Sequence, residues 1–97
     1  MERACVYILE CSDGSYYTGS TTDLERRLAD HNTGRYGGYT SSRLPVTLLW
    51  SLGFSDYRDA FAFERRIKKW SRVKKEALML GDFDLLHLLS RSTAMKK

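Results

Sequence analysis

Two short segments rich in β-forming residues near the N-terminus place the strongest constraint on how this chain can fold. Residues 4–11 and 15–19 flank an Asp-Gly pair, and both residues of that pair tolerate positive φ. The pattern predicts a β-hairpin that brings Tyr7 and Tyr17 close together on neighbouring strands. The first segment is apolar on both alternating faces, which is typical of a strand buried in the middle of a sheet.

The rest of the chain predicts one more strand and a series of helices. A helix begins at Thr22 and ends at Asn32-Thr33-Gly34, and a strand follows over 46–54. The next helix is capped by Ser55 or Asp56 and runs to a bend at Ser71. A further helical stretch ends at Gly81-Asp82, and a short helix covers 83–90. Glu25 would complete a capping box with Thr22. The predicted fold is α/β, more narrowly α+β, in the order β-β-α-β-α-α: a small three-stranded mixed or antiparallel sheet flanked by helices.

The length of 97 residues predicts one small domain, with its core over about 3–80 and a flexible tail over 91–97. The apolar run over 4–9 is too short for a signal-peptide core or a membrane span, so we expect a cytoplasmic protein without membrane contact. Cys5 and Cys11 match no zinc-ligand spacing and are expected to be reduced thiols.

The net charge of +4 is concentrated in one segment. Between Glu64 and Glu76 the chain carries seven basic residues against these two acidic ones, while apolar residues recur at Ile67, Trp70 and Val73. This pattern predicts an inward apolar stripe and an outward basic face that binds a polyanion; the alternative is a solvated helical face. The residues expected to contact nucleic acid are Arg65, Lys68, Lys69, Arg72 and Lys75, with Arg35 and Arg43 of a polar loop over 35–45.

Arg27 and His31 lie four residues apart, so they project side by side from one helix. A guanidinium can hold a phosphate through two hydrogen bonds, although a surface ion pair for Arg27 and an ordinary helix-end role for His31 remain alternatives. Glu64 stands among apolar residues, which favours either a bound cation or a salt bridge with Lys68. One carboxylate suits Mg²⁺ or Mn²⁺, and the lack of a second carboxylate cluster argues against a two-metal site.

Val6-Tyr7-Ile8 and Tyr17-Thr18-Gly19 resemble the two tyrosine motifs of the GIY-YIG nuclease family. Arg27, His31 and Glu64 match, in order, the arginine of the family's first helix, a histidine one turn later and the metal-binding glutamate of a later helix. The resemblance covers the chain to about Leu80.

The chain is most similar to the small standalone bacterial GIY-YIG proteins, through Thr40–Pro45 and Ile67–Ser71. The nuclease domain of the bacterial excision-repair endonuclease and the homing endonucleases are more distant likenesses. Cys5 and Thr18 stand where the family usually has glycine and isoleucine. Residues 74–76 read Lys-Lys-Glu where many members carry an asparagine.

The resemblance implies a divalent-metal-dependent endonuclease that hydrolyses phosphodiester bonds in nucleic acid, DNA rather than RNA, in bacterial DNA repair. It assigns catalytic roles to Tyr7, Tyr17, Arg27, His31 and Glu64. Glu64 would hold one Mg²⁺ or Mn²⁺ ion, Arg27 would clamp the phosphate and His31 would support a tyrosine or the phosphate. Either Tyr7 or Tyr17, acidified by nearby positive charge, would orient or deprotonate the attacking water.

Two other functions remain open at this point. One is a nucleic-acid-binding module of the same fold without substantial turnover, which the residues at 74–76 favour. The other is a protein-interaction adaptor, for which an apolar exposed patch would be the expected sign. The sequence indicates no obligate protein partner.

Overall fold

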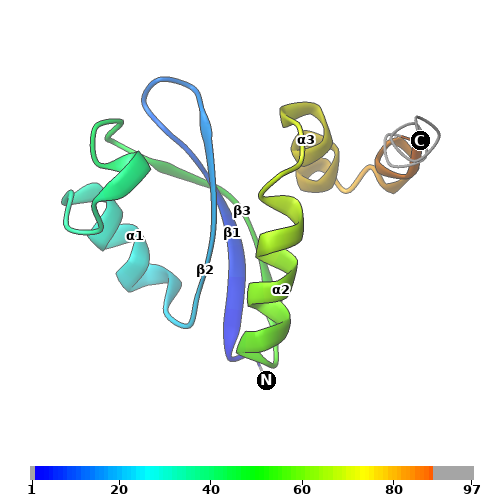
Figure 1. The fold of residues 1–97 in the computed structure, drawn as a ribbon, viewed down its shortest axis with the longest axis horizontal. Coiled ribbons are helices and arrows are strands. Elements are labelled where there is room, and N and C mark those ends of the chain that lie inside the picture. Colours follow the sequence, from blue (N-terminus) through cyan, green and yellow to red (C-terminus); the bar gives the residue numbers. More distant parts are fainter. Residues whose placement is uncertain (1, 89–97) are drawn as a thin grey trace.

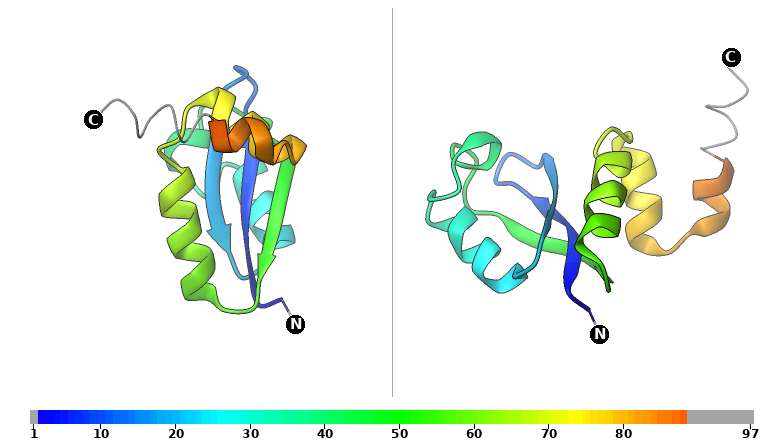
Figure 2. Two further views of the ribbon diagram at one scale, coloured as in Figure 1. Left: turned by 90° about the vertical axis from the view of Figure 1, so that its right-hand side faces the viewer. Right: turned by 60° about the horizontal axis from the view of Figure 1, so that its bottom comes forward.

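A computed structural model describes residues 2–88 of the protein. Its elements are β1 (Ala4–Glu10), β2 (Tyr16–Thr21), α1 (Leu24–Asn32), the 3-10 turn η1 (Gly38–Thr40), β3 (Thr47–Phe54), α2 (Tyr57–Ile67) and α3 (Arg72–Leu80), followed by helical turns over 83–88. The α1 helix and the loop after it cover one face of the sheet, and α2 covers the other with α3 beside it (Figures 1 and 2). This confirms the predicted β-β-α-β-α-α order. The predicted ends of the last helix and of the tail fall in 89–97, outside the described residues.

The sheet is antiparallel throughout, in the order β2-β1-β3, so its central strand is the one that its two apolar faces predicted. The hairpin turn is closed by the Cys11 N–H, which donates to the Ser15 carbonyl at 2.8 Å, and by Gly14 at φ 84°. Pairing continues beyond the predicted end of the second strand, because Ser20 and Thr21 still lie opposite β1. The outer edge of β2 has no neighbouring strand within the described sheet.

The two faces of β1 enter two separate cores. Alternate residues Val6 and Ile8 pack with residues of α2 such as Ala60 and Ile67. The intervening residues face the other way, where Tyr7, Leu9, Cys11 and Val46 pack with Tyr17, Leu24, Leu28 and Leu44. Because all side chains of this strand from Val6 to Leu9 have no exposed surface, the strand is the fixed reference to which both sides of the molecule are attached.

The first helix begins one residue later than the sequence predicted. Asp23, not Thr22, is its N-cap, and the Asp23 carboxylate accepts a hydrogen bond from the Arg26 N–H at 3.1 Å. The Thr21 hydroxyl accepts from the Asp23 N–H at 3.0 Å and so holds the chain extended for one more residue. The predicted capping box of Thr22 and Glu25 is therefore wrong, since the N-cap is one residue later and its side chain accepts from the Arg26 N–H, not from the Glu25 N–H that the box would have used.

The loop between α1 and β3 is closed at its base by a side-chain amide. Asn32, the last residue of α1, accepts from the Val46 N–H at 2.8 Å and donates to the Val46 carbonyl at 3.3 Å. These two hydrogen bonds satisfy the backbone N–H and carbonyl of Val46, which has no partner residue on a neighbouring strand of the described sheet. The loop over 33–45 is therefore a closed unit that lies against the sheet.

The bend predicted at Ser71 is confirmed as a break between two helices, so the basic segment does not carry the one continuous apolar stripe that was also predicted. α2 ends at Ile67, and α3 starts afresh at its N-cap Ser71, whose hydroxyl accepts from the Lys74 N–H at 3.2 Å. A break restarts the 3.6-residue period of a helix, so the inward and outward positions predicted for residues after Ser71 are wrong. Val73, expected to pack inward, is 54% exposed, whereas Lys75, expected to face outward, is only 8% exposed.

α3 is tied to the tip of the β1–β2 hairpin by an arginine. The Arg72 guanidinium lies over the Tyr16 ring at 3.9 Å and donates to the Gly14 carbonyl at 2.6 Å. Glu76 completes the arrangement, since its carboxylate accepts from the Tyr16 hydroxyl at 2.7 Å and from Arg72 at 3.3 Å. These bonds fix the second half of the basic segment against the sheet.

Cys5 and Cys11 are both free thiols, half-buried and buried respectively. Over residues 2–88, no helix combines the length and the apolar character that a membrane span requires.

Gly19 provides a stability test of the site's framework. A Cβ atom at Gly19 would lie 2.5 Å from the Tyr7 hydroxyl oxygen, in a ring that has no exposed surface and cannot retreat. Gly19→Ala should therefore lower the free energy of unfolding by roughly 1–3 kcal/mol, the usual cost of overpacking. Gly53→Ala is the matched control, because there the new methyl group meets only the mobile end of the Glu2 side chain. Chemical denaturation of both variants makes the measurement, and equal stabilities would refute the close approach at Gly19.

Candidate active site

The site is built around Tyr7, which crosses from the central strand to the edge strand. Its ring lies over Gly19, the residue directly opposite it on β2, and glycine is required there because a side chain would occupy the place of the phenol. Its hydroxyl ends 3.1 Å from Nε2 of His31. This explains physically why the second tyrosine motif ends in glycine.

His31 is a fully buried ring with both nitrogens hydrogen-bonded. Nε2 meets the Tyr7 hydroxyl and Nδ1 lies 2.8 Å from the Thr40 hydroxyl of η1. Burial lowers the pKa of His31, and the nearby charge of Arg27 lowers it further. The ring is therefore neutral at pH 7, which agrees with its two hydroxyl partners, since each can donate or accept. The alternative of an ordinary surface residue at a helix end is wrong.

Tyr17 and Arg27 lie on the same side of β2 as His31. The Tyr17 ring stands 6.4 Å from the Tyr7 ring and 5.2 Å from the His31 ring, which confirms the predicted approach of the two tyrosines. Nη1 of Arg27 donates to the Tyr36 hydroxyl at 3.2 Å and to the Ser20 carbonyl at 3.4 Å. Arg27 is thus half-buried against phenols and forms no ion pair within residues 2–88. Its charge is free to meet an anion.

The phenols are not acidified by their surroundings. Burial raises the pKa of Tyr7 to about 12, and the proximity of Arg27 offsets this only in part. Burial also raises the pKa of Tyr17, with Tyr36 and Glu64 acting in the same direction. The expectation that nearby positive charge acidifies a tyrosine is therefore wrong for the protein's own residues, because desolvation outweighs the guanidinium. Both phenols are protonated at neutral pH.

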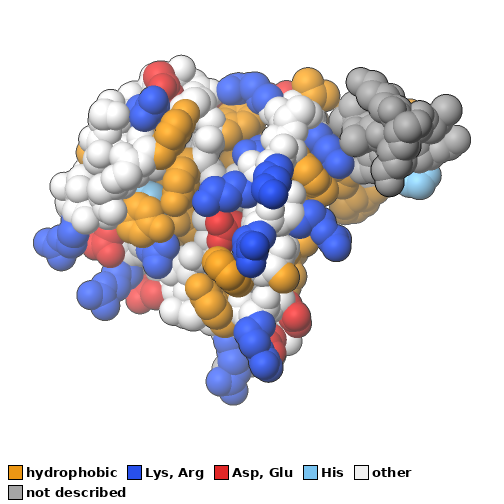
Figure 3. All heavy atoms as spheres, in the orientation of Figure 1, with side chains coloured by type: hydrophobic (Ala, Val, Ile, Leu, Met, Phe, Trp, Pro, Cys, Tyr) orange, Lys and Arg blue, Asp and Glu red, His pale blue; other side chains and the backbone are white. Residues whose placement is uncertain are grey.

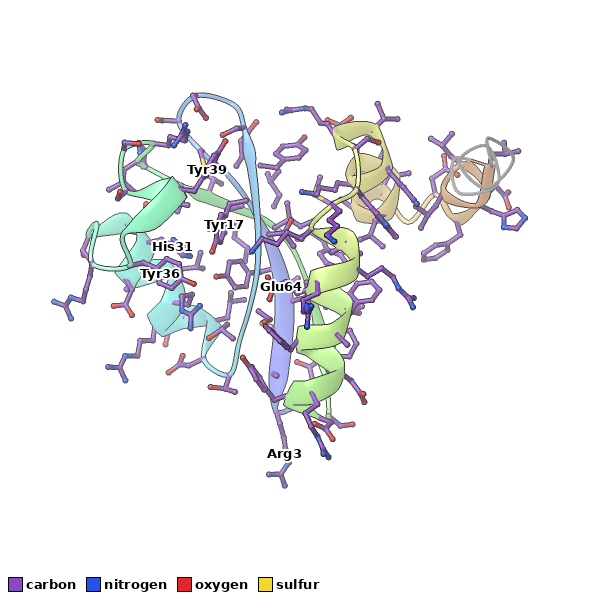
Figure 4. All side chains as sticks on the ribbon, in the orientation of Figure 1. Arg3, Tyr17, His31, Tyr36, Tyr39 and Glu64 are labelled. Atoms are coloured by element: carbon purple, nitrogen blue, oxygen red, sulfur yellow. The ribbon has the colours of Figure 1, made fainter. Side chains whose placement is uncertain are left out.

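Glu64 approaches the same strand from the opposite face. Figure 4 shows it on the α2 side of β2, while Tyr17, His31, Tyr36 and Tyr39 lie on the α1 side. One carboxylate oxygen accepts from the Ser20 hydroxyl at 2.7 Å, and the other is 3.6 Å from Nζ of Lys68. The predicted salt bridge therefore exists, but the Lys68 side chain is 56% exposed and contributes little by itself.

The carboxylate of Glu64 fits a single hard cation. Ser20 orients it through one oxygen, and its side chain is 10% exposed, at a hollow of about 620 Å³ lined by residues of α2. Residues 2–88 contain no cluster of three or more His, Cys, Asp or Glu side chains able to hold a metal. One protein carboxylate, with remaining ligands from water and a phosphate, is a common arrangement for Mg²⁺.

Basic side chains gather on the face that carries Glu64. Figure 3 shows blue Lys and Arg side chains over α2 and a band of apolar side chains beside them. Arg65, Arg66, Lys68 and Lys69 line the same hollow as Glu64. Arg35 is exposed on the loop that follows α1. Arg65, Lys68 and Lys69 are exposed like Arg35, and their contact with nucleic acid stays a prediction.

Three of the residues predicted to contact nucleic acid are engaged within the protein instead. Arg72 is bound to the hairpin, and Lys75 is buried so that its pKa is lowered by desolvation and by Lys68. Arg43 is ion-paired with Asp13 at 2.9 Å. The expectation that Lys75 faces outward is wrong, because the structure buries this side chain. Arg72 is exposed and Arg43 is partly exposed, and contact of either with nucleic acid stays a prediction.

Four residues of the site were not predicted. They are Ser20, Tyr36, Tyr39 and Thr40. Tyr36 and Tyr39 stand in the loop that its length and tyrosine content marked as functional, so a signal for them existed. Ser20 and Thr40 are small hydroxyl residues whose role depends entirely on distant partners, and no local pattern distinguishes them.

The neutral His31 ring predicts a pH-dependent stability. Because its folded-state pKa is below the usual 6.5, its contribution is complete above the unfolded pKa and is lost as the pH falls through the folded one. Between pH 7.5 and 5.0, the free energy of unfolding should fall more steeply in the wild type than in His31→Gln, by at most about 1.4 kcal/mol per pH unit. His87→Gln, at the exposed second histidine, is the control and should follow the wild type. Parallel pH profiles for His31→Gln and wild type would show that the ring titrates freely.

Comparison with known proteins agrees with this geometry. Residues 3–77 match the profile of the family described as the GIY-YIG catalytic domain. A UPF0213 protein of Halobacterium salinarum is 53% identical over 73 residues, covering 75% of this chain and 95% of that protein. One of Streptococcus pneumoniae is 47% identical over 82 residues, covering 84% and 83%. These names state no activity.

Solved structures show the same architecture. The solution NMR structure of protein EF2693 from E. faecalis has a TM-score of 0.57 at 39% identity, covering 88% of this chain and 93% of that one. The UPF0213 protein BH0048 from Bacillus halodurans has a TM-score of 0.50 at 45% identity, covering 77% and 80%. Nucleases with a GIY-YIG domain act on nucleic acids and generally depend on a divalent metal. On sequence and on fold, this chain belongs to the GIY-YIG family.

Proposed function

We propose that the protein is a divalent-metal-dependent endonuclease that hydrolyses phosphodiester bonds in nucleic acid. The observation that carries the proposal is the meeting of two unlike sets of groups at the free edge of β2. Phenols and Arg27 come from one face of the sheet, and Glu64 comes from the other, with Ser20 bonded to both sets. A phosphate at this edge would meet a guanidinium and a metal-binding carboxylate together.

In this proposal Arg27 binds the non-bridging oxygens of the scissile phosphate. Its guanidinium is held by neutral hydroxyl and carbonyl oxygens, which leave its charge uncompensated. Such a group stabilises the negative charge that develops in the transition state. Glu64, oriented by Ser20, would hold one Mg²⁺ or Mn²⁺, which when bound neutralises phosphate charge and lowers the pKa of nearby hydroxyl groups.

Tyr17 is the phenol we assign to the attacking water. It is half-buried, whereas Tyr7 has no exposed surface and is bonded to His31. Tyr7, His31 and Thr40 then form a hydrogen-bonded chain on the buried side of the Tyr17 ring and position that ring. Both phenols are protonated in the free protein. Tyr17 can therefore accept a proton only if positive charge in the substrate-bound state first lowers its pKa, so that it gives up its own proton.

DNA is the proposed substrate in preference to RNA, through the likeness to the nuclease domain of the excision-repair endonuclease, and the same likeness supports a proposed role in bacterial DNA repair. A single domain of this fold in the cytoplasm is in keeping with two free cysteines. The second candidate is a binding module without substantial turnover. It is favoured by the buried Lys75, which lies in the segment where many members carry an asparagine.

Replacing the Glu64 carboxylate tests which of these two functions the protein has. With Mg²⁺ or Mn²⁺, Glu64→Gln should reduce cleavage of DNA by at least about 100-fold, since the metal supplies several kcal/mol of transition-state stabilisation. The amide can still accept from Ser20, so the variant should fold and bind DNA in chelator like the wild type. Glu25→Gln, at an exposed carboxylate of α1, is the control. Cleavage unaffected by Glu64→Gln or by chelator would remove the metal role, and absence of cleavage by the wild type would favour the binding module.

The basic face of α2 predicts salt-dependent binding. Arg65→Ala with Lys69→Ala removes two exposed charges without touching Glu64 or its partners. Affinity for DNA of any sequence should fall, and the slope of log K against log salt should flatten by about 0.7–0.9 for each phosphate that is no longer neutralised. Arg3→Ala with Arg58→Ala removes the same formal charge outside the hollow, at Arg3 and at the N-terminal end of α2, and should change the slope less. If both pairs behave alike, the basic face is only solvated, and the anion-binding surface moves to the loop after α1, at Arg35.

A further inference from the structure

Two tyrosines of the site expose aromatic rings to which the chemistry proposed above gives no role, although the Tyr36 hydroxyl holds Arg27. Tyr36 and Tyr39 belong to the loop after α1 and are 42% and 44% exposed. The Tyr39 ring is nearly parallel to the Tyr17 ring, at an interplanar angle of 21° and a centroid distance of 6.3 Å. Figure 4 shows Tyr17, Tyr36 and Tyr39 on the same side of β2. They form an aromatic platform next to the phenol assigned to the attacking water.

Tyr39 is held in place although its ring is open to solvent. Arg43 donates to the Tyr39 carbonyl at 2.8 Å, and its guanidinium lies 3.9 Å from the ring centroid. Asp13, at the hairpin tip, fixes Arg43 through an ion pair at 2.9 Å. Thr40, the next residue, is buried and hydrogen-bonded to His31. An exposed ring that is fixed by its neighbours is ordered before any ligand arrives, so binding to it costs little conformational entropy.

We infer that Tyr39, supported by Arg43, stacks on the base of a nucleotide next to the scissile phosphate, so that the substrate carries an unpaired base there. This inference rests on the proposed function, because it names the substrate class of the same site. Aromatic side chains bind single-stranded nucleic acid by stacking, which tolerates any base because every base has a π-face. In an intact duplex both faces of each base are already covered by its neighbours. The platform therefore selects a single-stranded segment over a continuous duplex.

The inference gives Arg43 a role different from binding a phosphate. Its charge is compensated by Asp13, so it contributes little to the attraction of a distant phosphate. Its planar guanidinium instead lies over one face of the Tyr39 ring and supports the ring from that side. Arg43 is thus a positioning residue for the ring.

Binding in chelator tests the platform without requiring cleavage. The probe is a labelled single-stranded DNA oligonucleotide, compared with its blunt duplex and with a series in which one abasic residue is moved along the strand. Tyr39→Leu, which removes the ring but keeps apolar volume, should weaken binding of the single strand by about fivefold or more and leave duplex binding unchanged. Tyr39→Phe keeps the ring and should bind like the wild type.

The abasic series locates the stacked base. In the wild type, one abasic position should weaken binding as much as Tyr39→Leu does, and combining the two changes should cause no further loss of affinity. The inference would be overturned if Tyr39→Leu weakened binding of the single strand and of the duplex equally. It would also be overturned if Tyr39→Leu and the abasic residue together caused the sum of their separate losses of affinity. A Tyr39→Phe variant that behaves like Tyr39→Leu would overturn it too, since the hydroxyl and not the ring would then be responsible.

Adding Mn²⁺ to the same samples separates this inference from the proposed function. Cleavage of DNA with no effect of Tyr39→Leu or of the abasic residue leaves the nuclease standing and overturns the platform. Base-dependent binding with no cleavage upholds the platform and overturns the nuclease.

Discussion

The hydrogen bond between Tyr7 and His31, made across Gly19, is the interaction on which the rest of the site depends. It joins β1 to α1 and passes β2 at Gly19, the residue of that strand that has no side chain. Because both rings are fully buried, their positions are set by packing rather than by solvent. Tyr17 and Arg27 take their places around this pair, and the loop after α1 is held to it through Thr40.

Local patterns were sufficient for the order of the elements. The Asp-Gly turn, the alternation on the first strand, the cap at Asp56 and the break at Ser71 depend on neighbours within a few residues of one another. The motif residues Tyr7, Tyr17, Arg27 and His31 do gather, as their spacing and the resemblance suggested. The boundaries that failed, at Thr22 and beyond the α2–α3 break, failed by one competing cap or one reset of the helical period.

Long-range partners account for what the sequence could not reveal. Ser20 meets Glu64 across 44 residues, and the hydrogen bond that fixes Arg72 against the hairpin spans 58. The protonation of the phenols has the same origin, because burial, which depends on the whole fold, outweighs the charge of Arg27 at Tyr7. A charge pattern shows how many cations a segment carries, but only the packed structure shows that Lys75 is covered and Lys69 is not.

The peptide bond between Tyr39 and Thr40 joins two parts of the molecule with different neighbours. One residue presents its ring to the solvent, and the next hydrogen-bonds the His31 ring in the interior. The ends of the loop are fixed by Asn32 and Val46, so a push on Tyr39 cannot be absorbed by shifting the whole loop. A molecule that displaced the Tyr39 ring would therefore also displace the Thr40 hydroxyl, which is hydrogen-bonded to the His31 ring.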